Sequence, residues 1–103
     1  MGNVTLKLPG SDLASRRTAA VKRYQLVSQV QQGNQVTLDL SEVQSISESY
    51  ADELFGVLVA QQGFEWVQQH VSIIDVAEHV LDVIATAIQQ RLDEASHETV
   101  KSA

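Results

Sequence analysis

The sequence has no cysteine and only one proline among its 103 residues, and aromatic residues make up 5% of it. The absence of cysteine excludes disulfides and thiolate metal sites, and it fits a reducing compartment, so we expect a cytoplasmic protein. No apolar run approaches the roughly 20 residues that a membrane-spanning helix needs. The first residues, Met1 to Val4, lack the basic and apolar regions of a signal peptide. We therefore expect a soluble chain that does not enter a membrane.

Basic residues are also scarce, with seven Lys and Arg against thirteen Asp and Glu and a net charge of −6. That charge would be repelled by a phosphate backbone, so we do not expect a nucleic-acid binder. Residues 1–35 nevertheless hold five of the basic residues and a single Asp. Four of them lie in one short segment: Arg16, Arg17, Lys22 and Arg23. This segment is either a solvated helix face or a secondary docking face for an acidic partner or for the acidic half of a second copy.

The chain has the length and composition of one globular domain, with 44% hydrophobic and 19% charged residues. We expect this domain to span residues 1–95 and a polar C-terminal tail to span 96–103. Residues 4–8 and 36–40 alternate apolar and polar side chains, as half-buried strands do, and residues 71–74 form a third apolar strand. The polar alternate positions indicate that one face of the sheet is thinly covered or open to water.

Helical spacing fills the intervals between these strands. The first helix is expected from a cap at Ser11 or Asp12 to about Gln32, ended by Gly33. Its expected apolar positions are Leu13, Ala20, Tyr24, Val27 and Val30. The second helix is expected to begin at a Ser49 cap, to carry Ala51, Leu54, Leu58 and Gln62 on one face with Phe55 beside them, and to end at Gly63. Phe64 and Trp66 follow in a short segment that folds its rings onto the edge of the core.

The third helix is expected to start in a capping box formed by Asp75 and Glu78 and to run to about Asp93. Its expected buried positions are Val80, Leu81, Ile84, Ile88 and Leu92. The predicted fold class is therefore α/β, a small βαβαβα domain with a three-stranded mainly parallel sheet packed against helices. Such a sheet keeps two edges, which indicates a possible homodimer.

The turn before the second helix carries the functional interpretation. Ser49 followed by Asp52 fits a helix cap, and Asp52 and Glu53 lie in the first turn, where the helix dipole favours negative charge. In open α/β sheets, binding sites gather at the carboxyl ends of the strands, where this junction lies. The residues either start a helix and do nothing more, or they also form a binding surface.

The string Ile46-Ser-Glu-Ser-Tyr-Ala-Asp-Glu-Leu-Phe-Gly56, which follows Leu38-Asp-Leu40, resembles the STAS-like bacterial domains of unknown function. The upstream Ser15-Arg16-Arg17-Thr18-Ala19 is similar to that family's serine-arginine start of the first helix. More distantly, the chain is similar to the anti-sigma-factor antagonists, in which an Asp-Ser-Ser-Gly turn is phosphorylated on its first serine by an ATP-binding partner kinase. Alignment on Ile46 places Ser47 at the Asp, Glu48 at the phosphoacceptor, Ser49 at the second serine and Tyr50 at the glycine.

The resemblance implies a non-enzymatic regulatory or protein-interaction module of STAS-like type, without a cofactor. Its implied partner is a protein, such as an ATP-binding kinase-like or switch protein, bound through the start of the second helix. The residues implied at that surface are Ser47, Glu48, Ser49, Tyr50, Asp52 and Glu53. Glu48 cannot accept a phosphate, so a switch here would depend on Ser47 or Ser49, or the surface is permanently acidic.

Three alternatives stay open. The protein could be a homo-oligomeric structural or accessory domain without a switch. A small enzyme would need Ser47 or Ser49 beside His70 or His79, because a triad depends on geometry. An anion could bind the amides at the helix start, although Glu48, Asp52 and Glu53 oppose it. No metal is expected, since the three histidines, His70, His79 and His97, lack the spacing of a ligand motif.

Overall fold

The computed structural model describes residues 2–102, with the side chains of residues 2–96. The strands are β1 (Gly2–Lys7), β2 (Asp12–Leu13), β3 (Asn34–Asp39), β4 (Ser45–Ile46) and β5 (Val71–Ile74). The helices are α1 (Arg16–Gln31), α2 (Glu48–Ala51), the π-helical turn η1 (Asp52–Gly56), α3 (Val57–Gln62), α4 (Phe64–His70) and α5 (Glu78–Ser102). The segments α2, η1 and α3 follow one another without a break, so together they form the predicted second helix.

The main sheet has the order β1-β3-β5, and both strand pairs are parallel. This confirms the predicted α/β class and its three-stranded parallel sheet. Val36 and Leu38 of the central strand point into the core and are buried. On the other face, Thr5, Lys7 and Ser72 are exposed, which confirms that this face is open to water.

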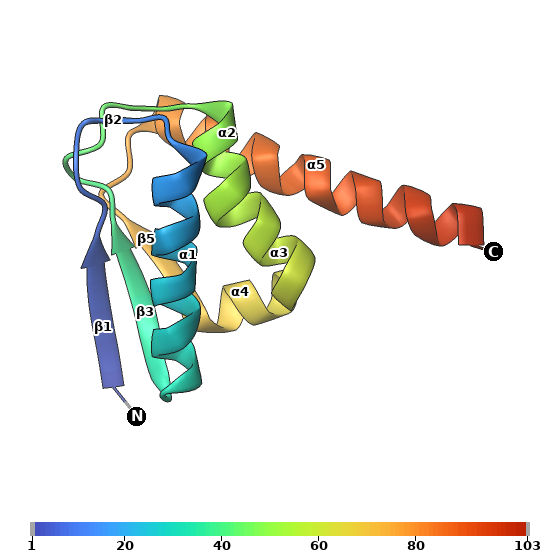
Figure 1. Cartoon of the computed structure of the whole chain (residues 1–103), viewed down its shortest axis with the longest axis horizontal. Helices are drawn as coiled ribbons and strands as arrows, with labels where there is room; N and C mark the ends of the chain where they lie inside the picture. The colour runs from blue at the N-terminus through green and yellow to red at the C-terminus, as the bar shows by residue number, and fades with distance from the viewer. Residues whose placement is uncertain (1, 103) are drawn as a thin grey trace.

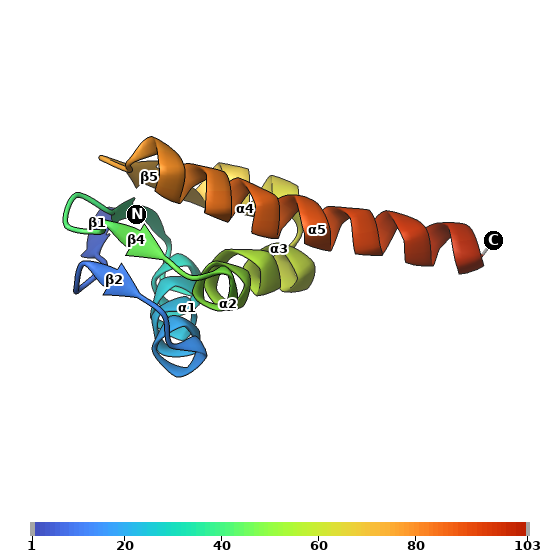
Figure 2. The same cartoon turned by 90° about the horizontal axis from the view of Figure 1, so that it is seen from above.

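All the helices lie on one side of the sheet (Figures 1 and 2). In the view from above, α2 and α3 lie between α1 and α5, so the segment that carries the acidic motif is covered on both flanks. The buried side chains of this segment are Tyr50, Ala51, Leu54, Phe55, Leu58 and Val59. The sequence does not predict Tyr50 and Val59, and Gln62, expected on the same face as Leu58, is exposed. The motif therefore lies in the middle of the helical layer.

A second sheet of two short parallel strands, β2 and β4, was not predicted. It occupies the position where the sequence suggested the start of the first helix, so α1 begins only at Arg16, with Ser15 as its cap. The Ser15 side chain accepts a hydrogen bond from the Thr18 amide. The predicted cap at Ser11 or Asp12 is therefore wrong.

The predicted apolar face of the first helix is also wrong in part. Its buried residues are Ala19, Arg23 and Leu26, whereas Tyr24 is 67% exposed. The periodicity was misread because a buried arginine does not look like a core residue in a sequence.

Differences at the C-terminal end concern α4 and α5. Phe64 and Trp66 lie on the short helix α4; Trp66 packs against the core as predicted, whereas Phe64 is 40% exposed. The capping box at Asp75 is wrong, because Asp75 has a positive φ of 56° and no hydrogen bond joins its side chain to the Glu78 amide; the amides of Val80 and Leu81 bond to the Ala77 carbonyl. Leu81 is exposed although it was expected to be buried.

The last helix is longer than predicted, since it continues through the stretch expected as a polar tail and ends at Ser102. Twenty-five residues of helix span about 37 Å at about 1.5 Å per residue. Its second half projects well beyond the body of the domain (Figures 1 and 2). Within the described residues, no helix is both long enough and apolar enough to cross a membrane.

Candidate functional site

The start of α2 is capped by Ser47, not by Ser49 as the sequence suggested. The Ser47 hydroxyl oxygen accepts a hydrogen bond from the Tyr50 amide at 3.0 Å, and the Ser47 backbone is extended. The same hydroxyl lies 3.2 Å from the Ala14 carbonyl, to which it donates. Ser47 therefore joins the start of α2 to the strand-to-helix turn ahead of α1.

Ser49 lies beside this cap and is half-buried. Its hydroxyl is 3.1 Å from the Ser47 hydroxyl and 3.4 Å from the Ala14 carbonyl. Tyr50 points the other way and is buried, and this burial raises the pKa of its phenol. The Tyr50 ring lines a hollow that Thr18 and Lys22 also line. The segment thus alternates between groups in the core and groups near the surface.

Asp52 is held by two arginines from the flanking helices. Arg91 of α5 binds it with two hydrogen bonds of 2.8 Å, from Nε to Oδ1 and from Nη2 to Oδ2. Arg16 of α1 donates to the same carboxylate at 3.2 Å. These bonds, the Arg91 pair first, hold the pKa of Asp52 below its usual value despite partial burial. Asp52 therefore ties α5 to α1 through η1.

Glu53, the next residue of η1, is also bound by two arginines. Arg23 Nη1 donates to Glu53 Oε2 and to the Glu53 carbonyl oxygen, both at 2.6 Å, and Arg16 adds a bond of 3.1 Å. The bonds from Arg23 and then Arg16 lower the pKa of Glu53. Arg23 is 4% exposed, and its Nε is the one buried side-chain nitrogen or oxygen without a partner in the described part of the chain. A buried charge of this kind has to keep its counter-ion.

Gly56, the last residue of η1, leaves space for this network. A Cβ atom at this position would lie 2.5 Å from Asp52 Oδ1 and 3.1 Å from Arg91 Cγ. The amide of Val57 bonds to the Asp52 carbonyl five residues earlier, which is the widened turn of a π-helix. Contacts within the chain thus explain the Asp-Glu-Leu-Phe-Gly string. Its two acids are ion-paired, its Leu and Phe are buried in the core, and its Gly lets Asp52 and Arg91 lie close to the backbone.

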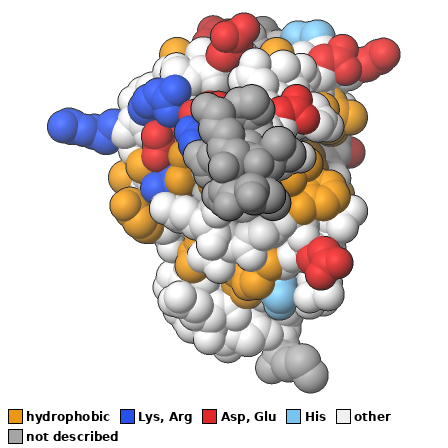
Figure 3. All heavy atoms as spheres, turned by 90° about the vertical axis from the view of Figure 1, so that its right-hand side faces the viewer, with side chains coloured by type: hydrophobic (Ala, Val, Ile, Leu, Met, Phe, Trp, Pro, Cys, Tyr) orange, Lys and Arg blue, Asp and Glu red, His pale blue; other side chains and the backbone are white. Residues whose placement is uncertain are grey.

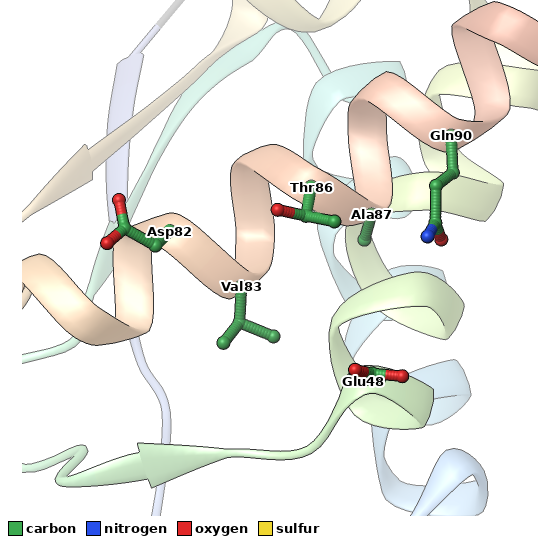
Figure 4. Close-up of a pocket in the computed structure, with 6 residues that line it drawn as sticks. All are labelled: Glu48, Asp82, Val83, Thr86, Ala87 and Gln90. Atoms are coloured by element: carbon green, nitrogen blue, oxygen red, sulfur yellow. The ribbon is translucent and has the colours of Figure 1, made fainter.

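Glu48 differs from the other two acids of the motif. Its side chain is exposed, and it makes no hydrogen bond or ion pair with any described residue. It lies at the edge of a hollow of about 180 Å³ between the start of α2 and one face of α5 (Figure 4). Asp82, Val83, Thr86, Ala87 and Gln90 of α5 line the opposite side. Two carboxylates at one hollow oppose an anion and favour a basic group.

The basic segment does not form one continuous face. Arg23 is buried against Glu53, and Arg16 is bound to Asp52 and Glu53. These two arginines are therefore counter-ions of the acidic motif in the same chain. Arg17 is exposed and Lys22 is half-buried. The interpretation of a solvated helix face therefore fails for Arg23, and Arg17 and Lys22 are left for a docking role.

The two histidines whose side chains are described, His70 and His79, make no hydrogen bond to the serines of the motif. His70 bonds to the Trp66 carbonyl within α4, and His79 bonds to the Gln44 carbonyl. Neither is hydrogen-bonded to Ser47 or Ser49, and the side chain of His97 lies outside the described residues. Among the described residues, no group of three or more His, Cys, Asp or Glu side chains is placed to hold a metal ion.

Sequence reasoning missed Arg91, the partner of Asp52. It lies 39 positions further along the chain, on a helix face that was expected to be polar. A signal did exist, because residues 36–96 carry eleven acidic residues and Arg91 is the single Lys or Arg among them. An isolated arginine in such an acidic stretch is expected to pair with a carboxylate.

A family model described as a STAS-like domain of unknown function (DUF4325) matches residues 21–81, more than half of the chain. The chain belongs to this family. The matched part of the STAS-like domain includes Arg23 and the whole motif from Ser47 to Gly56, whereas Arg16 and Arg91 lie outside it. The comparisons with curated proteins and with solved structures gave no match.

Proposed function

We propose that this STAS-like domain is a non-enzymatic regulatory module that binds a protein partner through the exposed start of α2. The observation that carries the proposal is the division of the three motif carboxylates. Asp52 and Glu53 are bound by arginines of the same chain, whereas Glu48 is exposed and has no partner among the described residues. Glu48 occupies the position where the anti-sigma-factor antagonists, to which the sequence is similar, carry their phosphorylated serine.

The surroundings of Glu48 indicate the chemistry of the partner. The hollow beside it combines two carboxylates with the apolar side chains of Val83 and Ala87. A Lys or Arg of a partner, whose aliphatic stem packs on apolar surface while its head meets a carboxylate, fits this combination. An ATP-binding kinase-like or switch protein remains the partner that the family resemblance implies.

Glu48 is the residue whose substitution tests this surface without disturbing the fold. Replacing Glu53 would disturb the Arg23 ion pair, so a loss of binding would not separate the surface from the fold. Glu48→Lys reverses a charge that no described residue uses. Glu65→Lys makes the same change on the exposed surface of α4 and is the matched control.

The experiment is a quantitative capture from lysate of the source organism with the wild type and both variants. The captured protein is then purified and its affinity measured by calorimetry. We expect Glu48→Lys to weaken binding by at least about tenfold, which corresponds to about 1.4 kcal/mol, and Glu65→Lys to leave it unchanged. Equal affinities for Glu48→Lys and the wild type would contradict the proposal. The protein is also incubated with the lysate and ATP, and its intact mass then shows whether Ser47 or Ser49 accepts a phosphate.

A further inference from the structure

An apolar groove lies on the opposite side of α5 from Glu48. It has a volume of about 320 Å³ and lies where α4, β5 and α5 meet. Its main apolar lining residues are Phe64, Ile73, Leu81, Ile84, Ile88 and Leu92. Gln89 is its one polar lining residue among those described, and none is charged. We call this surface the α4–α5 groove.

The groove exposes side chains that a lone domain would be expected to bury. Phe64 is 40% exposed and Leu81 is 42% exposed. Leu81, Ile88 and Leu92 form a stripe along α5 toward the projecting part of the helix; Ile88 and Leu92 are partly exposed, and Ile84 lies buried at the base of the groove. In Figure 3, hydrophobic side chains are visible on both sides of the projecting end of α5, whereas Lys and Arg side chains gather on one side only. A continuous apolar surface of this kind marks an interaction site.

Beside the groove, β5 is an unprotected edge of the main sheet. Its sequence Val71-Ser-Ile-Ile74 has no charge and no proline, so it lacks the residues that usually block pairing at an edge. The other edge strand, β1, carries Lys7, which is ion-paired to Glu42 at 3.2 Å, and it is followed by Pro9. Of the two edge strands, β5 is the one that carries no charged residue.

We propose that two copies of this chain form a twofold dimer in which β5 pairs with β5 and the two α4–α5 grooves meet across the axis. Two strands related by a twofold axis perpendicular to the sheet run antiparallel, so the two three-stranded sheets join into one continuous sheet. The axis keeps both grooves on the same side of the sheet. Phe64 and Leu81 of the two copies then cover one another.

The uncharged groove and the ends of β5 favour a second copy as the occupant. The net charge of −6 opposes association of two copies, but the groove has no charged lining residue, so contact between two grooves brings no like charges together there. The ends of β5 are also self-complementary. His70 precedes the strand and Asp75 follows it, so antiparallel pairing centred on the strand places His70 of each copy opposite Asp75 of the other.

The test is sedimentation equilibrium of the full chain from micromolar to submillimolar concentration. We expect a mass that approaches twice the 11.3 kDa of the monomer. Leu81→Glu, which introduces a charge into the groove, should raise the dissociation constant at least about tenfold. Val21→Glu replaces a similarly exposed apolar residue on α1 and should leave the dimer intact. If thermal melting shows that the Leu81→Glu variant does not fold, the Phe64→Gln variant is used in its place.

Hydrogen exchange gives an independent reading of the strand pairing. Amides of residues 71–74 should gain protection as the protein concentration rises, and Leu81→Glu should abolish that gain. A monomer at every concentration overturns the proposal, as does a dimer that Leu81→Glu leaves unchanged. The monomeric variant should still bind the α2 partner and Glu48→Lys should still dimerise, so the two proposals can fail separately.

Discussion

At the scale of residues, Glu48, Asp52 and Glu53 share one short motif but have different surroundings. Asp52 and Glu53 are each about one-fifth exposed as side chains and lie between arginines, whereas Glu48 faces water. Removing one partner of a buried ion pair costs about 3–5 kcal/mol because the remaining charge loses its counter-ion. An exposed charge without a partner contributes little to stability. The same residue type thus stabilises the fold at one position and is available for binding at another.

Gly56→Ala is the sharpest test at this scale. Alanine normally stabilises a helix relative to glycine by about 1 kcal/mol. Here the added Cβ would meet Asp52 Oδ1 at 2.5 Å and displace it from Arg91. We expect the free energy of unfolding, measured by urea titration, to fall by about 1–3 kcal/mol.

A double-mutant cycle separates this clash from a general helix effect. In an Asp52→Ala background the carboxylate is absent, so Gly56→Ala should then be neutral or stabilising. If Gly56→Ala destabilises both backgrounds equally, the proposed role of Gly56 is wrong.

At the scale of elements, the cap of α2 joins two segments that are 33 residues apart, because the Ser47 hydroxyl bonds to both the Tyr50 amide and the Ala14 carbonyl. Ser47→Ala should reduce the free energy of unfolding by about 1 kcal/mol, the usual loss for a helix cap. Ser49→Ala removes a hydroxyl that caps no amide and is the matched control, with an expected change within about 0.5 kcal/mol. Urea titration of both variants gives the comparison, and a larger effect at Ser49 would contradict the assignment.

The strands were predictable because their signal is local. Alternation in residues 4–8 and 36–40 gave the position and the exposed face of β1 and β3. The two-residue strands β2 and β4 are too short for any periodicity, so their pairing could not be read from the sequence. For the same reason the start of α1 was predicted at Ser11 or Asp12, although β2 lies there and the helix begins at Arg16.

The caps and the ion pairs were harder, since their partners are remote. Ser47 and Ser49 both have the composition of a cap, and only the bond to Ala14 distinguishes them. Arg23 looked like a surface residue because its partner, Glu53, lies 30 positions away. The site could therefore be located from the sequence, whereas the function of each residue within it depended on the fold.

At the scale of the molecule, the arginine network joins the three helical segments that lie side by side on the sheet. Arg16 and Arg23 come from α1, Asp52 and Glu53 from η1, and Arg91 from α5. The network adds ion pairs to the apolar contacts that hold these helices together. Stability should then depend on pH.

The direction follows from the pKa values of Asp52 and Glu53, which are lower in the folded state than in the unfolded state. A depressed pKa contributes stability above the unfolded value, about 3.9 for Asp and 4.3 for Glu, and that contribution is lost as the pH falls through the folded value. We expect melting temperatures to be nearly constant from pH 7 to about 5 and to fall steeply below about 4.5. The double variant Asp52→Asn/Glu53→Gln should be less stable at pH 7 and have a flatter profile, and equal slopes would contradict this account.

The most direct test of the central claim compares two neutralised glutamates in one motif by urea unfolding at pH 7. Glu53→Gln should lower the free energy of unfolding by about 3 kcal/mol or more, since it leaves the buried Arg23 without its counter-ion. Glu48→Gln should change it by less than about 0.5 kcal/mol, because no described residue binds that carboxylate. Equal effects of the two substitutions, or a larger effect at Glu48, would contradict the division between a structural acid and an acid free to bind a partner.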